Sequence, residues 1–195
     1  MLELRKKYKS GSAAEIIRNA ILSGEISGEI GQNEFAESLG VSRIPIREAL
    51  ITLQYHGLID KMSNQHVRII FPDDEAIREI FSDMSLLEIE TLKTLMPGKI
   101  QRLSSLSQIE FHRDIYMNTH SALRKNFLRI TTETYIAFVI EHSDGVRISP
   151  VFEDLKHALD DMSILRAAYA VYAEVLASEL IRIRNDNRRN NHAEP

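Results

Sequence analysis

Hydrophobic residues recur every three to four positions along the first 60 residues, the spacing of helices with one buried face. The pattern predicts helices over residues 12–22, 33–39 and about 44–56. We expect Asn33 to cap the second helix, and Gly40 and Gly57 to end the second and third. Residues 58–71 then predict a β-hairpin with its turn at residues 63–65.

The pattern after Pro72 is helical throughout. A long helix is expected to be capped within Pro72-Asp73-Asp74 and ended by Pro97-Gly98. Further helices are predicted around residues 109–116, over residues 127–140 and from about residue 150 to 183. The polar tail from about residue 184 is expected to be disordered. The fold class is therefore mainly α, with one domain over residues 1–71 and an all-α bundle over residues 72–195.

Composition and charge narrow the possible functions. The chain of 195 residues has no cysteine, so disulfides and cysteine-based metal sites are excluded. No apolar run is long enough to span a membrane, and the expected location is the cytoplasm. Residues 1–71 hold nine Lys and Arg against eight Asp and Glu, a net charge of +1, whereas the rest of the chain carries −5. Contact with phosphate is therefore expected in the first domain.

The third predicted helix carries two arginines at its start. Pro45 is tolerated in the first turn of a helix, and Ser42 is the natural cap. Arg43 and Arg47 then lie away from the apolar stripe, at the helix end whose free amides already attract anions. The arrangement predicts a winged helix-turn-helix whose second helix enters the DNA major groove. The alternative is a solvated face on which the arginines pair with Glu48 or Asp60.

The segment "EFAESLGVSRIPIREALITLQYHGLI" resembles the signature of GntR-family transcriptional regulators. The resemblance implies a dimeric repressor or activator, with a repressor as the leading interpretation, that binds double-stranded DNA at a near-palindromic operator. It implies DNA contacts from Ser42, Arg43 and Arg47, with Asn33 at the start of the preceding helix. The family's usual glycine is absent from the hairpin, and the wing contact is left open among four residues: Asn64, Gln65, His66 and Arg68.

The helical part resembles the FadR-type branch of this family, with an FCD-like domain that binds a small acid or a metal with its ligand. The branch's metal-binding members use one Asp and three His. Here His112 matches, Gln108 replaces the Asp, and Phe152 with either Tyr172 or Glu174 stands at the later His positions. We therefore expect no metal and no other cofactor. The expected lining of an effector pocket, for a ligand such as a small organic acid, is Gln108, His112, Tyr116, Arg129, Tyr169 and Tyr172.

An enzyme and an interaction module are the two other classes of function to compare with a regulator. An enzyme is not expected, because the chain has no P-loop, GxSxG, HExxH or cysteine nucleophile. A helical dimerisation or interaction module without effector sensing remains an alternative, although it leaves Arg43 and Arg47 unexplained. The leading interpretation is a dimeric DNA-binding regulator modulated by a small molecule.

Overall fold

A computed structural model describes residue 4, residues 11–61 and residues 66–193. The chain forms two compact units, one of residues 1–72 with 183–195 and the other of residues 73–182. The predicted wing tip, with Asn64 and Gln65, lies outside the described residues.

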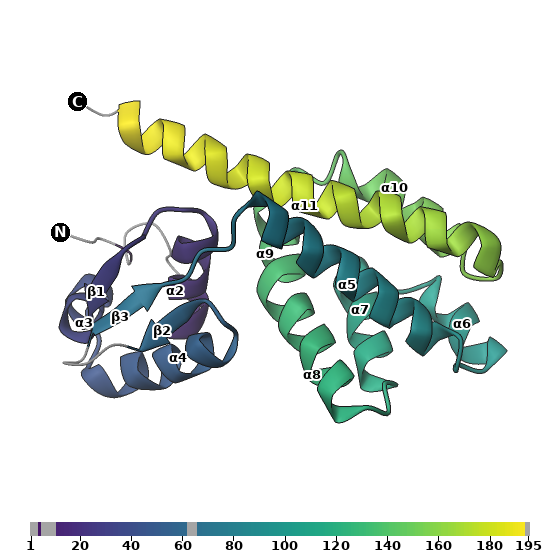
Figure 1. Ribbon diagram of the computed structural model, residues 1–195, viewed down its shortest axis with the longest axis horizontal. Coiled ribbons are helices and arrows are strands. Elements are labelled where there is room, and N and C mark those ends of the chain that lie inside the picture. The colour runs from purple at the N-terminus through teal and green to yellow at the C-terminus, as the bar shows by residue number, and fades with distance from the viewer. Residues whose placement is uncertain (1–3, 5–10, 62–65, 194–195) are drawn as a thin grey trace. The chain divides into compact units, whose positions relative to one another are not determined.

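In the described residues between 11 and 72, the first unit combines helices with a small sheet (Figure 1). Its elements are α2 (Ala13–Leu22), β1 (Glu29–Gly31), α3 (Gln32–Leu39), α4 (Arg43–Tyr55), β2 (Ile59–Lys61) and β3 (His66–Ile69). The strands form an antiparallel sheet in the order β1-β3-β2, with Ile30 opposite Val67 and Lys61 opposite Val67 on the other side. A helix pair followed by a hairpin confirms the predicted winged helix-turn-helix.

The packing of α4 follows the predicted stripe. Ile46, Ala49, Leu50 and Leu53 are all buried, and α4 packs against α2 and α3. Gly40 ends α3 with φ +63°, a left-handed conformation that glycine adopts without strain. Gly40 and the buried apolar face of α4 therefore determine the turn between α3 and α4.

The structure corrects the start of α3 and adds a strand before it. Gly31, not Asn33, occupies its N-cap position, and Asn33 lies exposed in the first turn. Residues 29–31, for which the sequence predicted neither a helix nor a strand, form strand β1 on β3. Three residues carry too little periodicity to reveal a strand, and this one exists because β3 offers it hydrogen bonds.

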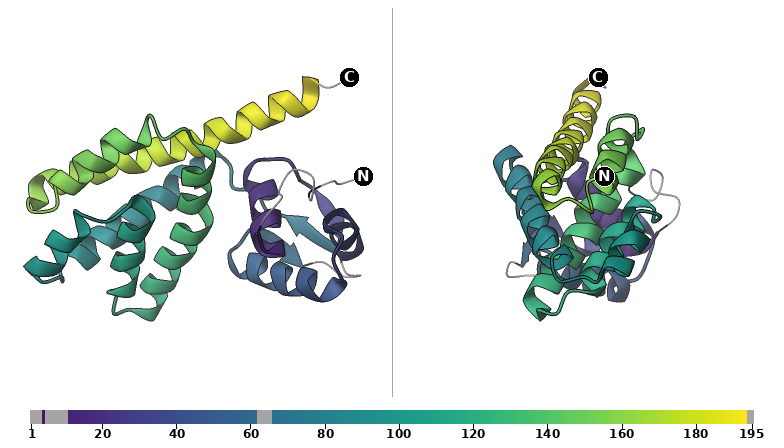
Figure 2. Two further views of the ribbon diagram at one scale, coloured as in Figure 1. Left: turned by 180° about the vertical axis from the view of Figure 1, so that it is seen from behind. Right: turned by 90° about the vertical axis from the view of Figure 1, so that its right-hand side faces the viewer.

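The second unit is helical. Its elements are α5 (Asp74–Leu92), α6 (Pro97–Leu103), α7 (Gln108–Met117), α8 (Ala122–Ile130), the π-helical segment η1 (Thr131–Ile136), α9 (Ala137–His142), α10 (Ile148–His157) and the first part of α11 (Met162–Ala193). Asp73 caps α5 as predicted, because its carboxylate accepts a hydrogen bond from the Ala76 amide at 2.9 Å. The views of Figures 1 and 2 show α10 beside α11.

The structure corrects three helix boundaries. Pro97 begins α6 rather than ending the preceding helix, since a proline in the first turn loses no helical hydrogen bond. The helix expected over residues 127–140 is α8, η1 and α9 in succession, with a π-helical turn in its middle. The tail expected to be disordered from residue 184 continues as α11 to Ala193, because Ile183 and Arg184 are buried and extend the packed part of that helix.

Candidate DNA-binding site and buried polar network

The start of α4 presents two exposed arginines. Arg43 is its first residue, Pro45 is its third, and the first turn contains no acidic side chain. Within the described residues neither Arg43 nor Arg47 makes a hydrogen bond or an ion pair, so the alternative pairing with Glu48 or Asp60 is not formed there. Two guanidinium groups beside a positive helix end form a site suited to a polyanion.

Ser42 and Asn33, the other expected DNA contacts of the two helices, are also exposed. Ser42 occupies the N-cap position of α4, but its hydroxyl makes no capping hydrogen bond to the helix backbone. Ser42 is therefore the N-cap residue as predicted, but it does not form the capping hydrogen bond that the prediction implied. Asn33 is exposed on α3, the helix that precedes the turn. Both side chains remain able to bond a partner outside the chain.

Strand β3 carries the described part of the wing. His66 and Arg68 are both exposed. The Arg68 guanidinium lies 3.4 Å from the Glu29 carboxylate on β1, with both side chains about half exposed. Such an exposed pair contributes little energy, and a phosphate could replace the carboxylate.

A buried polar network crosses the second unit from α5 through α7 to α11. The carboxylate of Glu88 accepts a hydrogen bond from the Tyr169 hydroxyl at 3.0 Å and lies 2.8 Å from His112 Nδ1. The other ring nitrogen of His112, Nε2, lies 2.7 Å from the Tyr172 hydroxyl, which also accepts a hydrogen bond from the Gln108 amide at 2.7 Å. Glu88, His112, Tyr169 and Tyr172 have no exposed surface. Four of the six residues expected to line an effector pocket, Gln108, His112, Tyr169 and Tyr172, thus belong to this network.

Burial fixes the direction of the hydrogen bonds in this network. Desolvation, and then the Glu88 charge and its hydrogen bond, raise the pKa of Tyr169 well above its usual value. Burial also raises the pKa of Tyr172 well above its usual value. Both phenols therefore stay protonated at neutral pH. With its oxygen accepting from Gln108, Tyr172 can donate to His112 Nε2, and Nδ1 is then the ring nitrogen that can donate to Glu88.

The remaining two expected pocket residues are bonded elsewhere. The Tyr116 hydroxyl donates to Glu133 at 3.1 Å, and Glu133 also holds Arg113 through two bonds of 2.7 and 2.6 Å. The Arg129 guanidinium donates to Asn126 at 2.9 Å. Their positions on the sequence did not show these competing partners.

The structure decides which residue stands beside His112 on α11. Tyr172 stacks on the imidazole with 5.6 Å between ring centroids, whereas Glu174 is half exposed and pairs with Arg78. Phe152 also reaches the cluster, 5.8 Å from the Tyr172 ring. Within the described chain, no three His, Cys, Asp or Glu side chains lie where they could hold a metal ion together.

Glu88 was missing from the sequence-based set of pocket residues. Its signal was a carboxylate inside an apolar stripe, since Phe81, Met84 and Leu92 lie at helical spacing from it and are buried. A buried charge in such a stripe requires a partner, and a histidine on a nearby helix is a natural one.

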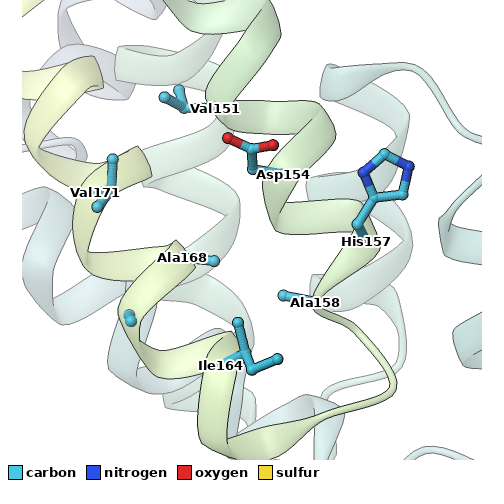
Figure 3. Close-up of a pocket in the computed structure, with 8 residues that line it drawn as sticks. Val151, Asp154, His157, Ala158, Ile164, Ala168 and Val171 are labelled. Atoms are coloured by element: carbon cyan, nitrogen blue, oxygen red, sulfur yellow. The ribbon is translucent and has the colours of Figure 1, made fainter.

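Two open grooves flank α11 in the second unit. One of about 290 Å³ lies between α5 and α11, and its lining includes Arg78, Arg166, Leu86 and Tyr169. The other, of about 440 Å³, lies between α10 and α11 (Figure 3). Its lining comprises Val151, Asp154, His157, Ala158, Ile164, Ala167, Ala168 and Val171. In Figure 3 the Asp154 carboxylate points toward α11, whereas the His157 ring points away.

The fold and the exposed arginines define a winged helix-turn-helix protein of the DNA-binding type. Residues 9–69 match the family described as bacterial regulatory proteins, gntR family. Over these residues the first unit is similar to the DNA-binding domain of that family's transcriptional regulators.

Relatives agree with this assignment over part of the chain. Two uncharacterized HTH-type transcriptional regulators, from two strains of Mycobacterium tuberculosis, are each 44% identical over 94 residues. The match covers 47% of this chain and 34% of each relative, so this chain spans about a third of their length. These relatives carry the names of regulators, not of enzymes.

A solved structure shares the fold over most of the chain. It is that of Lar, described as controlling the expression of the Listeria monocytogenes agr system and mediating virulence. The TM-score is 0.54 at 15% identity, covering 87% of this chain and 95% of that one. At this identity the likeness shows the fold alone. No helix in the described ranges has both the length and the apolar character needed to cross a membrane.

Proposed function

We propose that this protein binds double-stranded DNA as a dimer and regulates transcription, acting in the cytoplasm as a repressor. The observation that carries the proposal is the pair of exposed arginines, Arg43 and Arg47, at the N-terminus of α4 without a partner among the described residues. A cation at this helix end is unfavourable in the isolated helix, and a bound polyanion removes that cost. Ser42, Asn33, His66 and Arg68 would add contacts to phosphates or base edges.

The test is DNA affinity measured by fluorescence anisotropy at fixed salt, on duplexes recovered from a random library. Arg47→Ala should weaken binding by about 1–3 kcal/mol if the guanidinium contacts a guanine edge, or lower the salt slope by about 1 if it contacts a phosphate. Arg102→Ala is the matched control, because it removes the same charge from an exposed position in the other unit. Equal affinity of Arg47→Ala and the wild type would refute the proposed role.

The dimer is proposed from the apolar surface of α11. Ile164 and Val171 are each 54% exposed beside the groove between α10 and α11. Two copies joined here would present two α4 helices to a near-palindromic operator. Light scattering should show a dimer that Val171→Arg converts to a monomer, while Leu123→Arg on α8 leaves it intact. A wild-type monomer in the presence and absence of DNA would contradict this part.

A small organic acid is the proposed effector, and the proposal assigns it to the groove between α5 and α11 because two arginines border that groove. Arg78 and Arg166 border a partly apolar hollow, and Tyr169 lines it while its hydroxyl bonds Glu88 of the buried network. A carboxylate bound here could therefore act on the network through Tyr169. Thermal unfolding with a panel of small carboxylates should show a stabilising ligand whose effect Arg166→Ala removes. A wild-type panel without any shift would favour a helical unit that serves dimerisation only.

A further inference from the structure

The exposed face of α4 carries large apolar side chains as well as arginines. Ile44 is 71% exposed, and Ile51 and Tyr55 are each 59% exposed. They lie on the side of the helix opposite the buried stripe, so the core of the domain gains nothing from them. Together they form an exposed apolar surface on α4, and such a surface often marks a site of contact with a partner.

Ile44 occupies the second position of α4, between Arg43 and Arg47 in sequence. In a helix-turn-helix, the N-terminal residues of the second helix reach the base edges. The thymine C5-methyl is the apolar group that base edges present in the major groove, and it distinguishes T·A from the other pairs. We propose that Ile44 determines part of the sequence specificity by packing on a thymine methyl in each operator half-site. This inference rests on the proposed DNA-binding function.

The position of Ile44 separates it from Ile51. Seven residues later on the same face, Ile51 lies about 10 Å further along the helix axis. A helix that enters the groove by its N-terminus brings Ile44 to the bases and leaves Ile51 nearer the phosphate rim. Ile51→Ala is thus a matched control, since it removes the same side-chain atoms from a similarly exposed site.

The test replaces thymines by deoxyuridine, which removes the methyl group and leaves base pairing unchanged. The probe is the tightest duplex recovered from a random library, with each thymine of a half-site replaced in turn. At one thymine position the wild type should bind about fourfold more weakly, the fold-change expected for one buried methyl group. Ile44→Ala should bind the thymine and uracil duplexes equally well, whereas Ile51→Ala should keep the wild-type preference.

The possible outcomes separate this inference from the proposed function. If the library yields no sequence-specific duplex, the proposed function fails and the role of Ile44 with it. If a specific duplex is found but no uracil weakens wild-type binding, DNA recognition stands and thymine-methyl reading is overturned. The same holds if the uracil effect persists in Ile44→Ala. Far-UV circular dichroism of each variant verifies that the helices are retained.

Discussion

Polar side chains are exposed in the first turn of α4 and fully buried at the centre of the helical unit. Arg43 and Arg47 are exposed and have no partner in the described part of the chain. Glu88 and His112 have no exposed surface, and both oxygens of the carboxylate and both ring nitrogens are bonded. The exposed arginines are therefore free to bind a partner, whereas the buried groups bind one another and join α5, α7 and α11. Substitutions should therefore change binding in one region and stability in the other.

The largest effect is expected at Glu88. Glu88→Ala removes the acceptor of His112 and Tyr169 and leaves both donors buried without a partner. The free energy of unfolding should fall by about 3–5 kcal/mol, as it does when one member of a buried pair is lost. Urea unfolding followed by far-UV circular dichroism measures this fall. Glu174→Ala, which breaks the exposed pair with Arg78, should change stability by less than about 1 kcal/mol.

A second effect follows from the buried phenol of Tyr135. Burial raises its pKa to about 12, against 10.0 when unperturbed. The unfolded chain therefore ionises first, and this contribution to stability is complete below about pH 10 and lost as the pH rises toward 12. At pH 11 the loss should be about 1.4 kcal/mol. Urea unfolding between pH 9 and 11 should show a shallower decline in Tyr135→Phe, and identical slopes would contradict the assignment.

Two serines at helix N-caps sharpen the comparison. Ser12 caps α2, accepting a bond from the Glu15 amide, while Ser42 makes no capping bond to α4. Ser12→Ala should lower the free energy of unfolding by about 1 kcal/mol. Ser42→Ala should leave stability nearly unchanged and weaken DNA binding. If Ser42→Ala is as destabilising as Ser12→Ala, Ser42 serves the fold rather than the DNA.

The smallest effect is expected at Arg43, and in stability it has the opposite sign. Arg43→Ala removes a cation from a helix N-terminus and should stabilise the free protein by about 0.5 kcal/mol. The same change should weaken DNA binding. Thermal unfolding without DNA and anisotropy with DNA give the two values on one sample. A loss in both would mean that Arg43 has a partner within the fold.

Local sequence determined the winged helix-turn-helix part of the molecule. The stripe of Ile46, Ala49, Leu50 and Leu53 fixed the buried face of α4, and Gly40 fixed the turn before it. Arg43 and Arg47 were then necessarily exposed at a helix start, because periodicity within one helix decides which side chains face outward. The resemblance of this segment to a known family added its function.

Tertiary structure alone decided the helical half. His112 and Tyr172 are 60 residues apart, and no local pattern showed that Tyr172, not Glu174, would face the imidazole or that Glu88 would form a hydrogen bond with it. Tyr116 and Arg129 form hydrogen bonds with Glu133 and Asn126 instead of lining a pocket with His112. Strand β1 likewise depends on pairing with a distant segment, and Ile183 and Arg184 of α11 are buried where the sequence pattern predicted a disordered tail. Periodicity reports which face of a helix is buried, but the partner of a buried polar group is set by helix packing, which the sequence pattern does not encode locally.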